Sequence, residues 1–269
     1  MIRSLSVMNG YPVNRRDFLT LLVAGLLVPT RLTAEPIARG TTFAADIGIL
    51  YQMLTFQLKG DVQESVDRAA GRYDVRVNGQ GDGIGSRIES TGEWREGRWR
   101  PLRSASWFQV RGRESRVQVT YDYARRVVQY HARGETFLMR RLRVVDDVVA
   151  LPVGARIDDA ISASLNFRDG HWAPGADGQL HTLVIRRRRS ENEGPDDVVQ
   201  TYRAEIVPLD LKIEPEPETR RPSALLDLSR FSSWARESRP ARIVFDDERR
   251  PALITGSMIL GTSVTIRLG

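Results

Sequence analysis

The chain has 269 residues, a formal net charge of +6 and no cysteine. The lack of cysteine excludes disulfides, thiolate metal sites, a cysteine nucleophile and a cysteine-linked lipid anchor. Half of the net charge lies in the first 34 residues, where four arginines stand against one aspartate, so the rest of the chain is only mildly basic.

The amino-terminal segment resembles a twin-arginine export signal, carried by Asn-Arg-Arg-Asp-Phe-Leu at residues 14–19. The arginine pair is Arg15 and Arg16, and the apolar run from Phe18 to Val28 is too short to cross a bilayer, which takes about 20 helical residues. Ala34 is a small residue that suits cleavage. We therefore expect residues 1–34 to be a signal peptide, the twin-arginine export machinery to be a partner, and residues 35–269 to be a single β-rich domain in the periplasm.

The first part of the mature chain alternates between apolar and polar residues in short runs, as half-buried antiparallel strands do. The expected strands are 47–58, 73–77, 83–90, 99–110, 116–123, 127–132 and 136–144. Residues 78–83 are rich in Gly, Asn and Asp, which tolerate positive φ and let a strand reverse. The pattern predicts a meander.

A helix is expected at residues 157–170, within a chain that otherwise predicts strands. Ile157, Ile161 and Leu165 recur every four residues and form one apolar face. We expect Asp158 to cap the first turn, Asp159 to complement the positive helix end, and Gly170 to end the helix. On this interpretation Ile161 faces the sheet, and Asp159→Ala is expected to be mild.

Further strands are expected after the helix, at 180–188 and 198–207 and then at 241–245 and 253–268, the last interrupted near Gly256 and Gly261. The segment Glu-Pro-Glu-Pro-Glu at residues 214–218 is expected to be an extended, solvated spacer, because proline cannot donate a hydrogen bond inside a sheet. Together these patterns predict a mainly β fold: a large curved antiparallel sheet or open β-barrel with one helix packed on or in it.

Three motifs in this order resemble the DUF3108 family of exported bacterial envelope proteins. They are Gly-Glu-Trp at 92–94 leading through Gly-Arg-Trp at 97–99 to Pro101, the helix 158–168, and the run from Phe245 to Pro251 followed by Gly261 and Leu268. The resemblance covers most of residues 45–269. It implies an envelope location and a sheet-rich fold akin to the open barrels of lipoprotein carriers, and it supplies no catalytic residues.

No catalytic motif stands out in the sequence. Adjacent aspartates occur at 146–147, 158–159, 196–197 and 246–247, and they suit caps and turns better than paired acid and base catalysis, because neighbours in a strand point to opposite faces. The three histidines lack the spacing of a zinc site, and no Gly-x-Ser-x-Gly segment is present. Residues 81–85 precede a strand and not a helix, so they predict a turn and not a nucleotide loop. We expect no metal and no cofactor.

The candidate ligand-binding residues are Arg186, Arg188, Trp94, Trp99 and Trp107. In a strand, Arg186 and Arg188 share one face, where they could bind an anionic lipid or polysaccharide; alternatively, the acidic residues at 191–197 neutralise them at a solvated hairpin end. The tryptophans either line a ligand groove or fill the β core. Nucleic acid is not expected as a partner outside the cytoplasm.

Three functions remain open from the sequence. The first is a non-enzymatic periplasmic protein that binds an amphiphile, such as a lipid, or a cell-envelope polymer. The second is a hydrolase of envelope glycan or lipid that uses paired carboxylates such as Asp246 and Asp247, and the third is a structural partner in an envelope assembly. A deep apolar groove would favour the first, converging carboxylates the second and a flat apolar edge the third.

Overall fold

The computed structural model describes residues 37–49, 52, 54–136, 139–190, 193, 197–229, 231, 235, 238–258 and 262–269. The predicted export residues Arg15 and Arg16 and the predicted cleavage residue Ala34 lie outside this range. Within the described residues, none of the helices combines the length and the apolar character that crossing a membrane requires.

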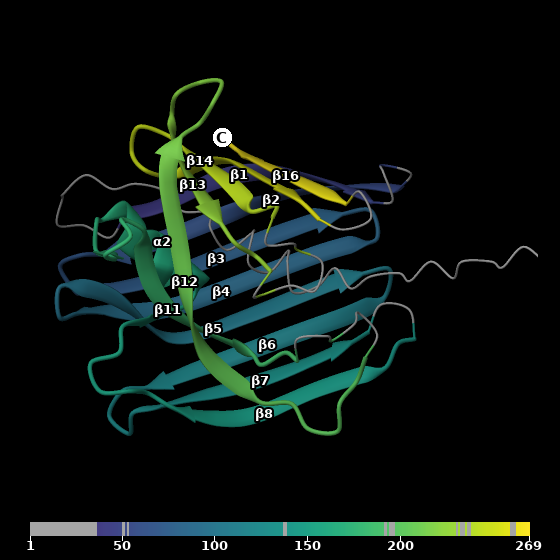
Figure 1. Cartoon of the computed structure of the whole chain (residues 1–269), viewed down its shortest axis with the longest axis horizontal. Coiled ribbons are helices and arrows are strands. Elements are labelled where there is room, and N and C mark those ends of the chain that lie inside the picture. Colours follow the sequence, from purple (N-terminus) through teal and green to yellow (C-terminus); the bar gives the residue numbers. More distant parts are fainter. Residues whose placement is uncertain are drawn as a thin grey trace, which may run out of the picture.

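Strands make up 63% of the structure and form one large, mainly antiparallel sheet that is curved and open (Figure 1). Its first eight strands are β1 (Ile37–Ile49), β2 (Leu54–Asp67), β3 (Arg72–Gly81), β4 (Ile84–Arg95), β5 (Arg98–Val110), β6 (Arg113–Asp122), β7 (Val127–Glu135) and β8 (Leu142–Ala150). The later strands are β9 (Ile157–Asp158), β10 (Ala173–Pro174), β11 (Leu180–Arg187), β12 (Ala204–Pro215), β13 (Pro222–Leu226), β14 (Ala241–Phe245), β15 (Pro251–Ser257) and β16 (Ser263–Leu268). The predicted fold class is confirmed, in its open form.

The strand order joins the two halves of the chain. The strands β1 to β8 form a meander, β10 to β16 form a second one, and β16 pairs with β1 to make both halves a single sheet. The register places Phe43 opposite Leu268 and Ile47 opposite Val264. The two-residue strand β9 lies off this path and pairs with β11 in parallel.

Alternating burial explains the strands. In β3, Tyr73, Val75 and Val77 point into the core while the residues between them are less buried, which is the period of two that a pleated strand imposes. The turn between β3 and β4 uses Gly83, whose φ of +65° suits glycine. The chain thus reverses within the expected segments 78–83 and 81–85, but the turn is only residues 82–83, because residues 78–81 pair with 84–87. In β4 the register shifts at Gly92, where a Cβ atom would lie 2.3 Å from the Tyr73 ring.

Several expected boundaries were wrong. The helix begins at Ala160 and not at 157, because Ile157 and Asp158 form β9 and pair with β11. The Thr136 N–H donates to Arg141 O at 2.7 Å, and the strand expected at 136–144 begins only at Leu142. The expected run 47–58 contains the end of β1 and the beginning of β2, and β12 begins at 204, not 198. The run 253–268 is divided, as expected, between β15 and β16. The Pro-Glu segment is a hairpin and not a spacer: Pro215 lies opposite Pro222, and Glu216 accepts from Thr219.

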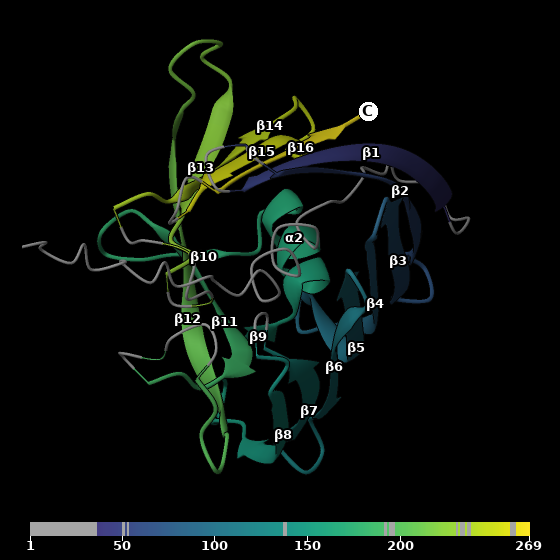
Figure 2. The ribbon, with the colours of Figure 1, turned by 90° about the vertical axis from the view of Figure 1, so that its right-hand side faces the viewer.

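The helix α2 (Ala160–Arg168) lies inside the curve of the sheet. Figure 2 shows α2 enclosed between β3 to β5 on one side and β11 to β13 on the other. Ile161, Leu165 and Phe167 are buried in the main core, together with residues of β1 to β5 and β11 to β16. The prediction that the helix is packed in the sheet is therefore confirmed.

Candidate functional site

The first turn of α2 is built by Asp159 and not, as expected, by Asp158. The Asp159 carboxylate accepts the Ser162 N–H at 2.7 Å, and the Ser162 hydroxyl lies 3.0 Å from the Asp159 N–H, which makes a reciprocal capping box. Each contact satisfies a backbone N–H that the helix leaves without an internal partner. The expected helix end is confirmed, because Gly170 has a φ of +78°.

Asp158 instead joins the helix to two strands. Its side chain is fully buried, and it pairs with Arg98 of β5 and accepts from Thr182 of β11. Ser162 and Asn166 of α2 donate to its other oxygen at 2.8 Å and 2.9 Å. Four donors compensate the cost of removing this carboxylate from water. The saturated Asp158 has the partners of a structural residue and leaves no oxygen for proton transfer.

Asn166 ties the same helix to the backbone of β5. Its side-chain amide donates to Trp99 O at 2.7 Å and accepts from Trp99 N–H at 2.9 Å, so it replaces a strand partner at this position. At the other end of the helix, Arg168 pairs with Glu64 and Asp169 pairs with Arg68. These contacts hold both ends of α2 against the inner face of the sheet.

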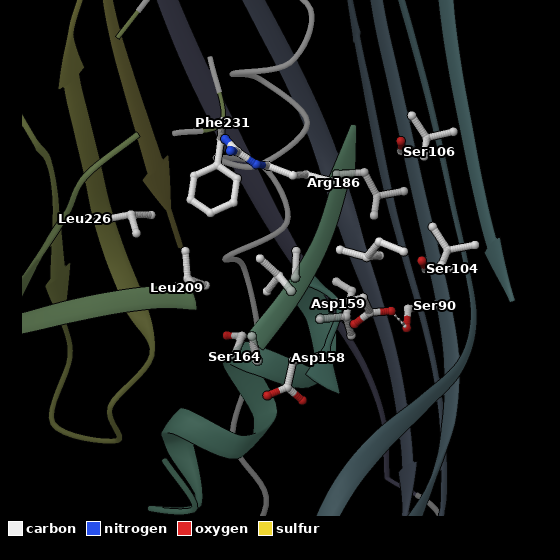
Figure 3. Close-up of a pocket in the computed structure, with 18 of the residues that line it drawn as sticks. Ser90, Ser104, Ser106, Asp158, Asp159, Ser164, Arg186, Leu209, Leu226 and Phe231 are labelled. Atoms are coloured by element: carbon white, nitrogen blue, oxygen red, sulfur yellow. Dashed lines mark hydrogen bonds between the residues drawn. The ribbon is translucent and has the colours of Figure 1, made fainter. Parts of the chain in front are cut away.

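A cavity of about 230 Å³ lies between α2, the inner face of the sheet and the C-terminal strands. The helix contributes Ile161 and Phe167, and the opposite side contributes Leu209, Leu226 and Phe231. Figure 3 shows Leu209, Leu226 and Phe231 on one side and the strand serines on the other. The walls are therefore mainly apolar and come from elements far apart in the sequence.

A row of small polar residues forms the wall on β4 and β5. Ser90, Ser104 and Ser106 line the cavity, and Figure 3 shows them along one side of it. Their short side chains leave space where larger residues would fill the core. This wall could have been predicted from the sequence, because Ser104 and Ser106 alternate in a strand. They share a face with Phe108, which is large and buried.

Asp159 lies at one end of the cavity, next to this wall. The Ser90 hydroxyl donates to its carboxylate, and the Tyr73 hydroxyl lies 3.0 Å from Ser90 Oγ. Burial raises the pKa of Asp159 to about 6, and the nearby Asp158 charge adds to the rise. Burial also raises the pKa of Tyr73 well above its usual value, so Tyr73 stays neutral. The closed end thus carries one titratable carboxyl.

Arginines line the other end. Arg186 points toward Phe231, with its guanidinium carbon 5.7 Å from the ring centre, and its Nη2 lies 2.6 Å from Glu205 (Figure 3). Arg187 also lines the cavity and pairs with Glu193 at 2.8 Å. The Arg186 side chain is 20% exposed, whereas Asp158 is fully buried, so water reaches the arginine end.

The structure separates the other predicted ligand-binding residues from this cavity. Arg188 is 71% exposed and does not line it. Trp99 is buried in an edge-to-face contact with Trp94, below the end of α2, and Trp107 lies beside Arg87 and Arg116 in a separate surface hollow. Of the five candidates, only Arg186 lines the cavity. Trp172, which the sequence did not single out, lines it as well.

Of the adjacent aspartates that were expected in caps and turns, the pair at 246–247 lies in a turn, whereas Asp146 and Asp147 lie within strand β8. Asp246 accepts from the backbone N–H groups of Glu248 and Arg250 in the turn between β14 and β15. In the part of the chain that the structure describes, no three His, Asp or Glu side chains are placed to hold a metal ion.

Comparison with known proteins gives no relative: no family model, curated protein or solved structure matches this chain significantly. The resemblance to DUF3108 proteins stays a prediction. The fold and the cavity define the class of site: a partly open, mainly apolar cavity in a curved β-sheet, with a basic end that water reaches.

Proposed function

We propose that the protein is a non-enzymatic periplasmic protein that holds an amphiphile, such as a lipid, in the cavity beside α2. The observation that carries this proposal is the combination of apolar walls with an arginine end. Burying apolar ligand surface is favourable by about 25 cal/mol per Å². Arg186 and Arg187 at the water-reached end suit a negatively charged head group, since guanidinium binds carboxylate and phosphate oxygens well.

An envelope polymer is a less suitable ligand for this cavity than a lipid. A glycan presents hydroxyl groups along its whole length, and most of the walls offer no hydrogen-bond partner for them. The serine row could bind only one side of such a chain. The chemistry of the walls therefore favours an apolar tail with a polar end.

A hydrolase is the alternative, and the acids that it would use are poorly placed. Asp246, one of the pair suggested by the sequence, is engaged in its own turn. Asp158 is saturated by four donors, which leaves Asp159 as a single titratable carboxyl at the closed end. One carboxyl without a positioned nucleophile does not supply the acid and base pair that glycoside cleavage needs.

The first experiment is native mass spectrometry with lipid extraction on protein isolated from the bacterial envelope. We expect a lipid to co-purify and added anionic phospholipid to bind at micromolar concentration, which corresponds to about −8 kcal/mol. Consistently empty protein that also fails to bind added phospholipid would contradict the proposal and favour a structural role in an envelope assembly.

Two variant pairs locate the ligand. Arg186→Gln should weaken binding of an anionic lipid about ten- to hundredfold, because a charge-assisted hydrogen bond contributes about 1.5–3 kcal/mol, while Arg188→Gln is the matched control outside the cavity. Ser106→Phe should fill the cavity and exclude the tail, while Trp107→Phe changes the neighbouring residue outside it. Equal effects of Arg186→Gln and Arg188→Gln would place the head group elsewhere.

A further inference from the structure

Exposed apolar side chains are concentrated at one edge of the sheet. Of the nine large apolar side chains that are exposed in the described residues, seven lie on β8, directly before or after it, or at residues 198 and 199, and they are Met139, Leu142, Val144, Val148, Val153, Val198 and Val199. The other two, Leu102 and Ile213, lie on other strands. We define the edge patch as Leu142, Val144, Val148, Val198 and Val199.

Two contacts hold the halves of the edge patch together. Asp147 of β8 accepts from the Ala204 N–H at 2.8 Å and pairs with Arg203, and Arg143 donates to Asp197 O at 2.6 Å. These bonds place the segment 197–204 along β8. In Figure 1, β8 lies at the lower end of the sheet and the chain leading into β12 passes close to it.

The outward face of β8 is mainly apolar, whereas the outward face of an edge strand in water is usually polar. Arg143 and Val145 are buried, so Leu142, Val144 and Val148 occupy the opposite, outward face and are 45%, 49% and 58% exposed. Soluble proteins usually place charged residues on the outward face of an edge strand, because apolar edges aggregate. A row of exposed valines here indicates a surface that binds something apolar.

Cations accompany these apolar side chains. Arg133 lies opposite Val144 in the β7–β8 pairing, and Arg141 directly precedes Leu142. Neither has a carboxylate partner among the described residues, whereas the nearby acids Glu135 and Asp147 are paired with Arg140 and Arg203. Asp146 lies on the outward face between Val144 and Val148 and is 76% exposed, and it contacts His131 at 2.9 Å. Among the charges that the structure describes here, the arginines beside the edge patch are therefore those without a partner, which matches an anionic surface.

The edge strand β8 is also linked to the open end of the cavity. Glu193 bridges Arg187, which lines the cavity, and Arg143, which lies between Leu142 and Val144 in β8. The distances are 2.8 Å to Arg187 and 3.6 Å to Arg143. Arg143 points to the inner face of the sheet, so these contacts link the cavity arginine Arg187 to the inner side of β8, and the edge patch lies on the outer side of the same strand.

We propose that the edge patch docks the protein on an anionic lipid bilayer. The valines and the leucine enter the boundary between head groups and acyl chains, and Arg133 and Arg141 pair with lipid phosphates. Docking in this orientation places the bilayer along β8, whose inner side is linked to Arg187 through Arg143 and Glu193. The proposal extends the proposed lipid-binding function, but the docking surface itself does not depend on what occupies the cavity.

The test is co-sedimentation of the full chain with vesicles of phosphatidylcholine, with and without phosphatidylglycerol. Val144→Ser with Val148→Ser should lower the vesicle partition coefficient about tenfold, because two apolar side chains no longer enter the bilayer. Leu102→Ser with Ile213→Ser is the matched control and should leave it unchanged. All of these chains carry the same amino-terminal segment, so the difference between them reports on the edge patch.

A second pair tests the charge. Arg133→Gln with Arg141→Gln should lower binding to vesicles that contain phosphatidylglycerol severalfold and leave binding to phosphatidylcholine unchanged. Arg76→Gln with Arg125→Gln, both exposed arginines outside the edge patch, is the control. Thermal unfolding of each variant checks the fold, and surface changes of this kind should shift stability by less than about 0.5 kcal/mol.

The outcomes separate docking from ligand binding. Reduced vesicle binding by the Val144→Ser with Val148→Ser variant supports docking, whether or not a lipid occupies the cavity. If wild type carries a co-purified lipid, the variant should retain it. The proposal is overturned if wild-type protein does not bind vesicles, or if the edge-patch pair and the control pair change the partition coefficient equally. A wild-type dimer that becomes monomeric on Val144→Ser with Val148→Ser also overturns it and assigns the edge patch to a second copy of the chain.

Discussion

At the scale of single residues, the neighbours Asp158 and Asp159 have different structural roles. Asp158 holds Arg98 and Thr182 of two strands, while Asp159 caps the helix and meets Ser90. The sequence indicated an aspartate cap at this place but assigned it to the wrong one of the two. The assignment depends on Arg98, which lies 60 residues away and whose position only the folded sheet determines.

The expectation that Asp159→Ala is mild also changes, because this cap is buried and its loss typically costs about 1 kcal/mol or more.

The raised pKa of Asp159 predicts a pH dependence of stability. Its pKa is about 6 in the folded protein, against 3.8 for an ordinary aspartate, so between these values the folded state binds more protons than the unfolded state. The contribution of Asp159 to the free energy of unfolding therefore falls as pH rises from about 4 to about 6 and then levels off. Asp159→Asn, which retains a good capping side chain, should remove this slope.

Urea unfolding of wild type and Asp159→Asn across this pH range measures the effect. The difference in unfolding free energy between the two proteins is the relevant quantity, because it cancels the contributions of other carboxyl groups. A difference that stays constant from pH 4 to pH 7 would show that Asp159 keeps an ordinary pKa.

At the scale of elements, α2 is held by packing more than by its own length, since nine residues are too few to be stable alone. The sequence predicted this helix because Ile161 and Leu165 recur at helical spacing, although Ile157, which continues the spacing, lies in β9 and packs in a second cluster. It predicted most strands because their alternation is local. It missed β13, since Pro222 and a run without alternation give no strand signal. It also misplaced β8, because an edge strand with valines on its outward face does not alternate as a solvated strand should.

The packing of α2 predicts the effect of one buried charge. Ile161 is 1% exposed, so Ile161→Asp places a carboxylate in the core without a partner and should cost more than about 4 kcal/mol, a large part of the stability of a typical domain. Ile161→Val, which removes one methylene from the same site, should cost about 0.5–1.5 kcal/mol. Denaturant unfolding measures both, and equal stability of Ile161→Asp and wild type would mean that the helix does not pack inside the sheet.

At the scale of the whole molecule, the sheet owes its continuity to β16, which lies between β15 and β1. The sequence could predict neither this pairing nor the cavity, because both depend on contacts between distant strands. Hydrophobic alternation indicates which face of a strand is buried but not which strand lies beside it. Arg186 was found because its neighbours in sequence are also arginines, whereas Phe231 and Leu226 carry no local signal that marks them as cavity walls.

Removal of residues 263–269 should prevent folding of both halves of the sheet. The deletion exposes the edges of β15 and β1 together, so the core that they share opens to water. We expect the truncated protein to lose the cooperative thermal transition and to show a weaker β-strand signal in circular dichroism. A truncated protein that keeps a cooperative transition would mean that the two meanders fold independently.

The predicted route of export can be tested in cells. Arg15→Lys with Arg16→Lys should leave the precursor in the cytoplasm, because twin-arginine recognition depends on that pair. Cell fractionation measures the distribution, and a double variant that reaches the periplasm in undiminished amount would indicate the general secretory route or no use of this segment.

The pairing of β16 with β1 also has a consequence for the order of events in folding. Asp46 meets Arg267 across 221 residues, and Thr42 meets Gly269 O across 227, so these contacts form only after most of the chain has been synthesised. Contacts between residues so distant in sequence close large loops, and proteins rich in them fold slowly. Until β16 arrives, β1 presents an unpaired edge for the whole time that the intervening strands are made. We therefore expect the growing chain to need protection by a chaperone along β1, and its final folding step to follow the synthesis of β16.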